Sequence, residues 1–351
     1  MEKLLSDYRK NIGEFEVIDF EDEAIVQGVR SRMDVDVPVD LHWTWSYESE
    51  IDELRRLYEK GKAGQWNAQT DLDWDTPIER SDWILNPEFS LMANVVKMFG
   101  GSEAAQKEAT HDEIAYTLSQ LLHGEQAALQ LCGQLTNVCT EIDQKFYAAS
   151  QVIDEARHTE VLAKFLGEKI GEIHPIGADL KTLLDILLEA EGMQKKVLGM
   201  QTLFEGMAVG IMDTIRKESR NELLSTMIHR VEQDESRHAA FGVLNMRRIV
   251  RDASKQQMDE MEDWAFNILE TLNANQQLEM LRTFADKYGY DPESVVAVAT
   301  QLPNFAELNS PIYMHTVVPN LRNLGLITDR TEDHWRRVGM IYDANATAIA
   351  S

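Results

Sequence analysis

The residues best suited to chemistry in this sequence form a short motif that occurs twice. Residues 154–158 read DEARH and residues 234–238 read DESRH. Each copy places a glutamate and a histidine at positions i and i+3, so on a helix both side chains leave the same face one turn apart. A carboxylate and an imidazole from one turn suit a first-row transition metal, whereas Ca²⁺ and Mg²⁺ prefer shells of oxygen alone. The repeat therefore predicts two metal-binding turns.

Each copy of the motif also follows a glutamate in an apolar stretch at the same interval. Glu125 lies 30 residues before Glu155, and Glu205 lies 30 residues before Glu235. An ionised carboxylate in apolar surroundings is costly unless it is paired or binds a metal. This is the ligand set of a carboxylate-bridged two-metal site inside a four-helix bundle. The predicted ligands are Glu125, Glu155, His158, Glu205, Glu235 and His238.

Two other glutamates compete with Glu205 for its place in this set. Glu189 and Glu191 lie earlier on the same predicted helix. They stand roughly two to three turns from the level expected of the other ligands, and their surroundings are less apolar. We therefore prefer Glu205.

The residues beside the predicted ligands suggest a second layer of contacts. Asp154 and Asp234 each precede a ligand glutamate and could accept the outer N–H of the opposite motif's histidine, which would fix the imidazole tautomer and raise its basicity. Arg157 and Arg237 could neutralise the acidic cluster. The alternative is that these four side chains are ordinary surface charges of a helix.

Small residues flank two of the predicted ligands. In a bundle core they leave volume that larger side chains normally fill, which would suit a substrate cavity. Close packing of the helices explains the same residues equally well, so both interpretations stay open. The residues concerned are Gly124, Ala128, Gly206, Ala208 and Val209.

The overall charge of the chain limits its partners. Its 351 residues contain 34 Lys and Arg against 60 Asp and Glu, a formal net charge of −26. Such a field repels nucleic acids and anionic lipid surfaces, so we expect neither as a partner. A basic partner would fit, but an acidic surface also serves solubility.

The cysteines and the apolar segments indicate the compartment. Cys132 and Cys139 lie on one helix face, roughly 10 Å apart along the axis, which is too far for a disulfide. Two buried thiols are typical of a reducing compartment. We find no signal peptide and no apolar run long enough to span a membrane, and therefore expect a cytoplasmic protein.

The periodicity of apolar residues is helical along most of the chain, so we expect an all-α fold with a four-helix bundle at its core. The single domain, 1–351, would consist of an N-terminal arm and helix (1–80), a di-metal helical bundle (84–252) and C-terminal accessory helices (253–351). The predicted helices span residues 47–62, 87–99, 112–139, 141–170, 180–217 and 221–252.

The doubled motif with its upstream glutamates resembles the ferritin-like di-iron carboxylate superfamily. The branch that it resembles holds the ribonucleotide reductase small subunit and its oxygenase relatives, including the p-aminobenzoate N-oxygenases. The resemblance covers roughly residues 50–250 and implies that the six predicted ligands hold two iron ions, or one manganese and one iron. It also implies O2 as co-substrate and an external electron donor, either a reductase or a ferredoxin.

A second stretch also resembles the reductase subunit. Residues 57–67, followed by Asp71, are similar to the segment that bears its electron-relay tryptophan. The resemblance implies that Trp66 contacts Asp234 and could pass electrons to the metals through Asp234 and His158. A packing tryptophan whose N–H is satisfied by Asp234 is an equally good interpretation.

The sequence departs from the family patterns at two positions. Leu162 stands where the reductase subunit stores its radical on a tyrosine, which disfavours a tyrosyl-radical generator, although variants with a mixed manganese/iron centre lack that tyrosine too. Val231 stands where the N-oxygenases have a seventh ligand, a histidine. This second departure counts against membership of the N-oxygenase subgroup.

The function expected from these residues is that of a non-haem di-iron oxygenase or oxidase, a homodimer that oxidises a small organic substrate. One alternative is a ribonucleotide reductase small subunit, which a C-terminal tail bearing a tyrosine would favour; only Tyr342 lies near that end. Another is an iron storage or detoxification protein, although ferritins are about half as long.

Overall fold

The computed structural model describes residues 40–273, 276–285, 287–302 and 312–341. Within these ranges the regular structure is helical, and the isolated bridge residues include the antiparallel pair Leu85 and Ser219. Among the helices of these ranges, none combines the length and the apolar character that crossing a bilayer requires.

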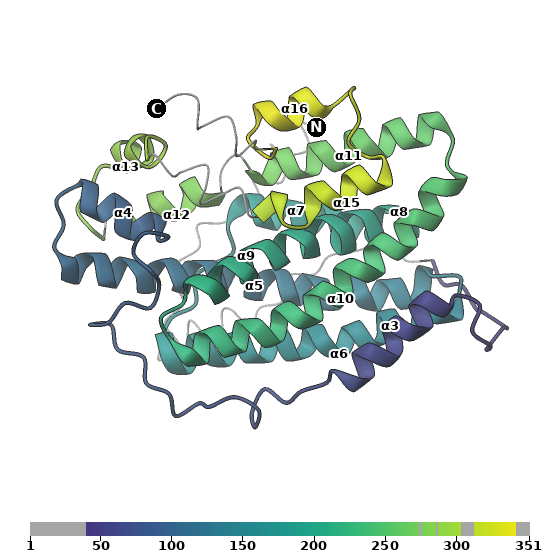
Figure 1. Cartoon of the computed structure of the whole chain (residues 1–351), viewed down its shortest axis with the longest axis horizontal. Helices are drawn as coiled ribbons and strands as arrows, with labels where there is room; N and C mark the ends of the chain where they lie inside the picture. The colour runs from purple at the N-terminus through teal and green to yellow at the C-terminus, as the bar shows by residue number, and fades with distance from the viewer. Residues whose placement is uncertain (1–39, 274–275, 286, 303–311, 342–351) are drawn as a thin grey trace.

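The core is built from long helices that lie side by side (Figure 1). Helix α5 (Glu103–Val138) packs against α6 (Ile142–Phe165), and α9 (Glu205–Glu218) packs against α10 (Glu222–Asp252). Helix α6 continues into a short π-helical turn, η1 (Leu166–Ile170). This arrangement confirms the predicted all-α bundle.

Hydrogen-bonding side chains mark where three of these helices begin. The side chain of Ser102 accepts a hydrogen bond from the backbone N–H of Ala105 at the start of α5, and Asn221 caps α10 in the same way. Glu141 and Gln144 form a reciprocal capping box at the start of α6. Because the cap of α5 is Ser102, this helix begins nine residues before its predicted start at 112.

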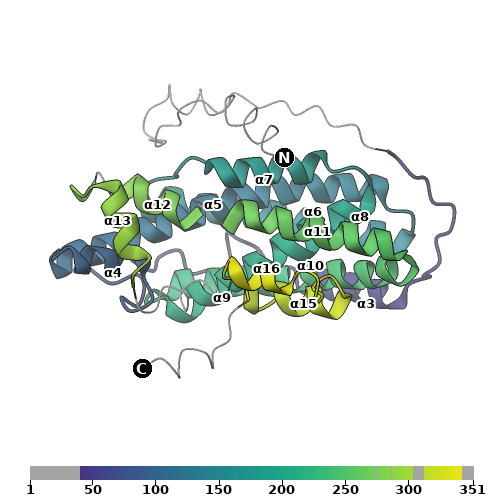
Figure 2. The same cartoon turned by 90° about the horizontal axis from the view of Figure 1, so that it is seen from above.

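Further helices cover the bundle from both ends of the chain (Figures 1 and 2), and the predicted accessory helices are confirmed. Helix α3 (Asp52–Ala63), which starts five residues later than predicted, packs against α6 and α10, while α4 (Leu91–Met98) packs against α5. The C-terminal helices are α11 (Lys255–Asn273), α12 (Gln276–Ala285), α13 (Pro292–Ala299), α15 (Val317–Leu324) and α16 (Glu332–Arg337).

The single helix predicted over residues 180–217 is wrong. The chain instead forms α7 (Ala178–Glu189), α8 (Gly192–Lys196), the π-helix η2 (Val197–Phe204) and α9. Ala190 leaves the helical conformation with ψ of 126°, and Gly192 has a positive φ of 74°. Only glycine adopts that φ without a steric cost, and apolar periodicity on both sides of the break concealed it.

A buried lysine forms hydrogen bonds across the break between α7 and α8. The side chain of Lys196 is almost fully buried, and its Nζ donates to the backbone carbonyl of Leu188, 2.9 Å away, and to Oε1 of Gln134. The Leu188 carbonyl belongs to the last turn of α7, whose carbonyls have no partner further along the helix. Burial lowers the pKa of Lys196 to about 8.

The π-helix η2 lies against α10 at a point where α10 has no side chain. A Cβ on Gly242 would stand 2.7 Å from the backbone carbon and oxygen of Gln201. Because these are backbone atoms, they cannot rotate away as a side chain would. Gly242 is therefore what allows η2 and α10 to approach closely.

Gly242→Ala should lower the free energy of unfolding by about 1–3 kcal/mol, because the added methyl group overpacks the contact with Gln201. Gly133→Ala is the matched control, since no atom lies within 4 Å of its Cβ position in α5. That control should gain about 0.5–1 kcal/mol from helix propensity. Urea unfolding of both variants measures the difference, and equal effects of the two substitutions would contradict the close approach.

Candidate metal centre

The structure brings the six predicted ligands together in the middle of the bundle. Helix α5 contributes one of them, α6 two, the first residue of α9 one and α10 two, and all are buried. Their ligand atoms form two groups of four, each within a span of 4.8 Å, and Glu155 and Glu235 belong to both groups. One group adds Glu125 and His158, and the other adds Glu205 and His238.

This polar cluster lies between two apolar cores. Along α5, Leu121 and Leu122 belong to one core, Ala127 and Ala128 belong to the other, and Glu125 stands between them. Neither core offers the carboxylates a polar partner, so their charge must be balanced within the cluster itself.

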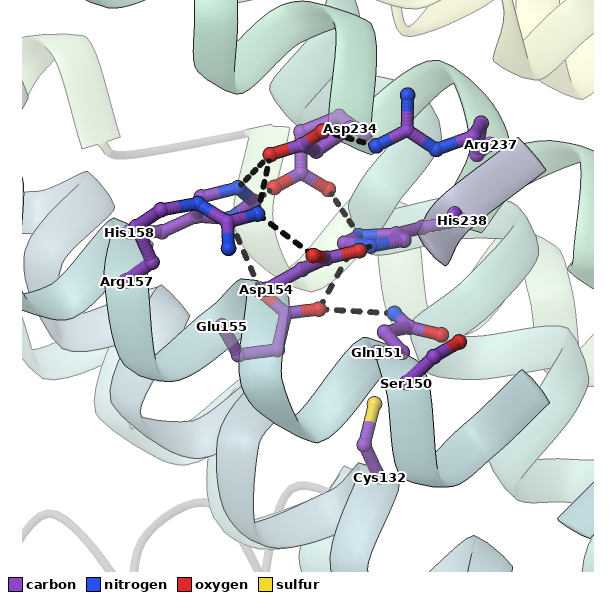
Figure 3. Close-up of polar contacts among 12 residues, drawn as sticks. Cys132, Ser150, Gln151, Asp154, Glu155, Arg157, His158, Asp234, Arg237 and His238 are labelled. Atoms are coloured by element: carbon purple, nitrogen blue, oxygen red, sulfur yellow. Dashed lines mark hydrogen bonds and ion pairs between the residues drawn. The ribbon is translucent and has the colours of Figure 1, made fainter. Parts of the chain in front are cut away.

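The outer nitrogen of each histidine faces the aspartate of the opposite motif. Nε2 of His158 is 3.1 Å from Oδ2 of Asp234, and Nε2 of His238 is 3.3 Å from Oδ2 of Asp154 (Figure 3). Arg157 contacts both aspartates, at 2.6 and 2.9 Å. All of these side chains are buried, so they are not surface charges of a helix.

The fourth flanking residue, Arg237, is partly buried and contacts one of the aspartates. Its guanidinium donates to Oδ1 of Asp234. The two aspartates and the two arginines thus form one hydrogen-bonded layer outside the histidines (Figure 3).

The inner nitrogens of the histidines face carboxylate oxygens. Nδ1 of His158 is 2.8 Å from Oε1 of Glu235, and Nδ1 of His238 is 3.0 Å from Oε2 of the same residue. If each Nε2–H donates to its aspartate, each neutral imidazole aims the lone pair of Nδ1 at these oxygens. Acceptors that face acceptors need cations between them, and nitrogen and oxygen donors suit first-row metals. The residues present therefore fit a pair of metal ions.

The pKa values of the metal-free cluster show the same need for positive charge. Burial, followed by repulsion from Glu235, raises the pKa of both Glu125 and Glu205 well above the ordinary value. Burial would lower the pKa of His158 and His238, but the surrounding carboxylates outweigh it and raise both. Protons thus supply the positive charge that metal ions would otherwise bring.

Glu155 and Glu235 behave in the opposite way. Burial alone would raise their pKa, but His238 and other neighbours outweigh it and lower the pKa of Glu155 well below its ordinary value. The same opposition lowers the pKa of Glu235 to about 2. The histidines therefore favour the ionised form of the two shared carboxylates, whereas Glu125 and Glu205 keep their protons to a higher pH than an ordinary glutamate.

Trp66 makes the contact that the resemblance implied. Its indole Nε1 donates to Oδ2 of Asp234 at 2.8 Å, and the guanidinium of Arg157 lies over its ring, 5.0 Å from the centroid. Trp66, Asp234 and His158 thus form a continuous line of contacts that ends at the cluster.

The small residues near the ligands are largely accounted for by packing. A Cβ on Gly124 would stand 2.6 Å from Cζ of Phe204, and one on Gly206 would stand 3.0 Å from Cγ2 of Val317. Ala128 and Ala208 belong to the two apolar cores. Val209, the last of the set, lines a groove at the surface.

Sequence reasoning missed two glutamines. Nε2 of Gln151 donates to Glu155 at 2.8 Å (Figure 3). It also donates to Glu205 at 3.1 Å, and it therefore links carboxylates from two helices. Its position four residues before Glu155, on the same helix face, was the available signal. Gln65 contacts both Arg157 and Asp154, and only its place beside Trp66 could have pointed to it.

In metal-stripped protein at about pH 7, Glu205→Gln should raise the free energy of unfolding, because glutamine keeps the shape of the protonated carboxyl and removes the cost of holding a proton that the unfolded chain releases. Glu155→Gln should cost on the order of 3–5 kcal/mol, because it removes the ionised partner of both histidines. Urea unfolding in a chelator compares them.

The free energy of unfolding of the metal-stripped protein should fall as the pH rises because of Glu205. The raised pKa of Glu205 gives a contribution to stability that is fully present below its ordinary pKa and lost as the pH rises through the raised value. Glu205→Gln should remove this loss at high pH. A larger cost for Glu205→Gln than for Glu155→Gln would contradict this assignment of the protons.

Comparisons with known proteins were made by family and by structure. The family model described as P-aminobenzoate N-oxygenase AurF matches residues 48–325. A comparison with curated proteins found no match.

Three solved structures of R2-like ligand-binding oxidases are similar in fold. A mutant with an aerobically reconstituted Mn/Fe cofactor has 15% identity and a TM-score of 0.48, covering 81% of this chain and 96% of its own. A photoconverted form has 15% identity and a TM-score of 0.47, with 81% and 95% covered. A mutant with an Fe/Fe cofactor has 16% identity and a TM-score of 0.45, with the same coverage.

The family match spans most of the chain, including the predicted ligands and Trp66. Val231 is buried in an apolar core at the position where N-oxygenases were expected to have a seventh ligand. Because the family match covers so much of the chain, this one difference does not exclude membership. The chain therefore belongs to the family described as P-aminobenzoate N-oxygenase AurF, oxidoreductases of the ferritin-like di-iron type.

Proposed function

We propose that this protein is an O2-dependent oxygenase or oxidase that oxidises a small organic substrate at a two-metal centre. The observation that carries the proposal is the pair of overlapping ligand groups, which share Glu155 and Glu235 as candidate bridging carboxylates. We assign two iron ions to it, with one manganese and one iron as the other composition that the ligands suit. When bound, these ions supply the redox chemistry for reducing O2.

The protein's own residues orient the metal ligands, exclude water from the cluster and connect it to the surface. Asp154 and Asp234 fix the tautomers of the two histidines, and Gln151 holds Glu155 and Glu205 in a common orientation. The two apolar cores on either side exclude water from the cluster. Trp66, through Asp234 and His158, is our proposed route for electrons from an external reductase or ferredoxin.

The family description makes an aromatic amine the first substrate class to test. Val231 leaves the site one imidazole short of the ligand set expected of N-oxygenases, so other oxidations of small organic molecules belong in the same screen. We propose a homodimer in the cytoplasm as the working form.

The two alternatives are less well supported. The position expected to hold a radical-storing tyrosine is Leu162, which is fully buried in an apolar core. Tyr342 lies outside the described residues. Family membership favours an oxidoreductase over iron storage.

Metal content and O2 uptake test the proposal together. Protein expressed with iron and manganese should carry about two metal ions per chain by elemental mass spectrometry, and the reduced protein should consume O2. Glu205→Ala should lose metal and O2 uptake. Glu189→Ala is the matched control, because Glu189 is exposed at the end of α7, and it should retain both.

Well under one metal ion per chain in the unsubstituted protein would reject the two-metal centre. Two ions per chain without any O2 uptake after reduction would keep the metal site and reject the oxygenase. If Glu205→Ala and Glu189→Ala lose the same amount of metal, the assignment of Glu205 as a ligand is contradicted.

A further inference from the structure

A groove of about 590 Å³ runs along the surface between α3, α10 and the start of α15. Helix α10 packs against both α3 and α15 (Figure 1). Apolar side chains, among them Leu57, Val209 and Leu244, line part of the groove. Its lining also includes three exposed cations, Arg56, Lys60 and Arg247.

Within the described part of the chain, no ion pair or hydrogen bond joins the side chain of Arg56, Lys60 or Arg247 to a carboxylate. In the same described ranges Lys97, Lys195 and Arg337 are also exposed without such a partner, so what distinguishes the three cations is that they line one groove. One acidic residue, Glu53, also lines the groove. The groove is therefore a locally basic surface on a strongly acidic protein.

The groove adjoins the candidate metal centre through α10. Ser236 and Ala239 line the groove, and each directly follows a predicted ligand, Glu235 or His238. The groove and the cluster thus lie on neighbouring faces of one helix. Lys60 belongs to the last turn of α3, and the chain continues from there to Trp66, whose indole contacts Asp234.

We propose that this basic groove is the docking surface for a small acidic electron-transfer protein of the ferredoxin type. Charge complementarity selects the partner: unpaired cations attract an acidic surface, whereas the remaining acidic surface of the chain repels it. Apolar lining residues such as Leu244 add contact area that charge alone does not supply. At each encounter the donor loses one electron, which passes to the metal pair, so two encounters supply two electrons.

This inference rests on the proposed function for the fate of the electron, but the docking itself does not need bound metal. The test therefore measures binding of a plant-type [2Fe–2S] ferredoxin to the full chain, both metal-loaded and metal-stripped, by fluorescence anisotropy. The variant reverses the three cations, with Arg56→Glu, Lys60→Glu and Arg247→Glu.

At low salt the variant should bind ferredoxin at least about tenfold more weakly than the unsubstituted protein, and the difference should shrink as salt is added. A matched control with the same change in net charge should stay within about twofold. Its substitutions lie at exposed cations outside the groove that no described carboxylate pairs with, Lys97→Glu, Lys195→Glu and Arg337→Glu.

Reduction of the metal-loaded proteins separates docking from chemistry. With reduced ferredoxin the groove variant should be reduced more slowly, whereas with dithionite and methyl viologen it should match the unsubstituted protein. If the protein binds ferredoxin through the groove but takes up no metal, the proposed function is wrong and the docking surface is supported.

Several results would overturn the docking surface itself. These are no ferredoxin binding by the unsubstituted protein, equal weakening in the groove variant and the control, or binding that does not respond to salt. A change of native mass from dimer to monomer in the groove variant alone would show that a second copy of the chain covers the groove instead.

Discussion

The constraint on which the rest of this structure depends is the burial of four carboxylates and two imidazoles between two apolar cores. Charge at that depth cannot be balanced by solvent, so it must be balanced by protons, by metal ions or by neighbouring side chains. In the metal-free state the histidines favour the ionised form of the shared carboxylates Glu155 and Glu235, whereas burial favours protons on Glu125 and Glu205 and raises their pKa. Metal ions would replace those protons with charge of the same sign.

The layer outside the histidines follows from the same constraint. Each imidazole keeps one orientation only if its outer N–H has a fixed acceptor, and Asp154 and Asp234 provide it. Those aspartates are themselves buried, and ion pairs with Arg157 and Arg237 balance their negative charge. Trp66 donates to the same aspartate from the outside. The interior therefore connects to the surface at this point through polar contacts rather than through apolar packing.

Much of this site could be predicted from the sequence, because its ligands are spaced by helix geometry. The i, i+3 spacing, the equal intervals to Glu125 and Glu205 and the aspartate before each motif are all local patterns. The break at Ala190 and Gly192 could not be predicted, since apolar periodicity continues on both sides of it. The π-helix η2 directly before Glu205 lies against Gly242, and local patterns do not reveal this contact between distant segments. The extent of the single domain, 1–351, stays a prediction.

The central claim is that two metal ions lie among these six side chains. Crystals grown from iron-loaded protein and measured on either side of the iron absorption edge test this most directly. We expect two anomalous peaks in the bundle, one beside His158 and one beside His238, both next to Glu155 and Glu235. No peak at this cluster, or a single peak elsewhere, such as among the carboxylates around Arg80, would contradict the central claim.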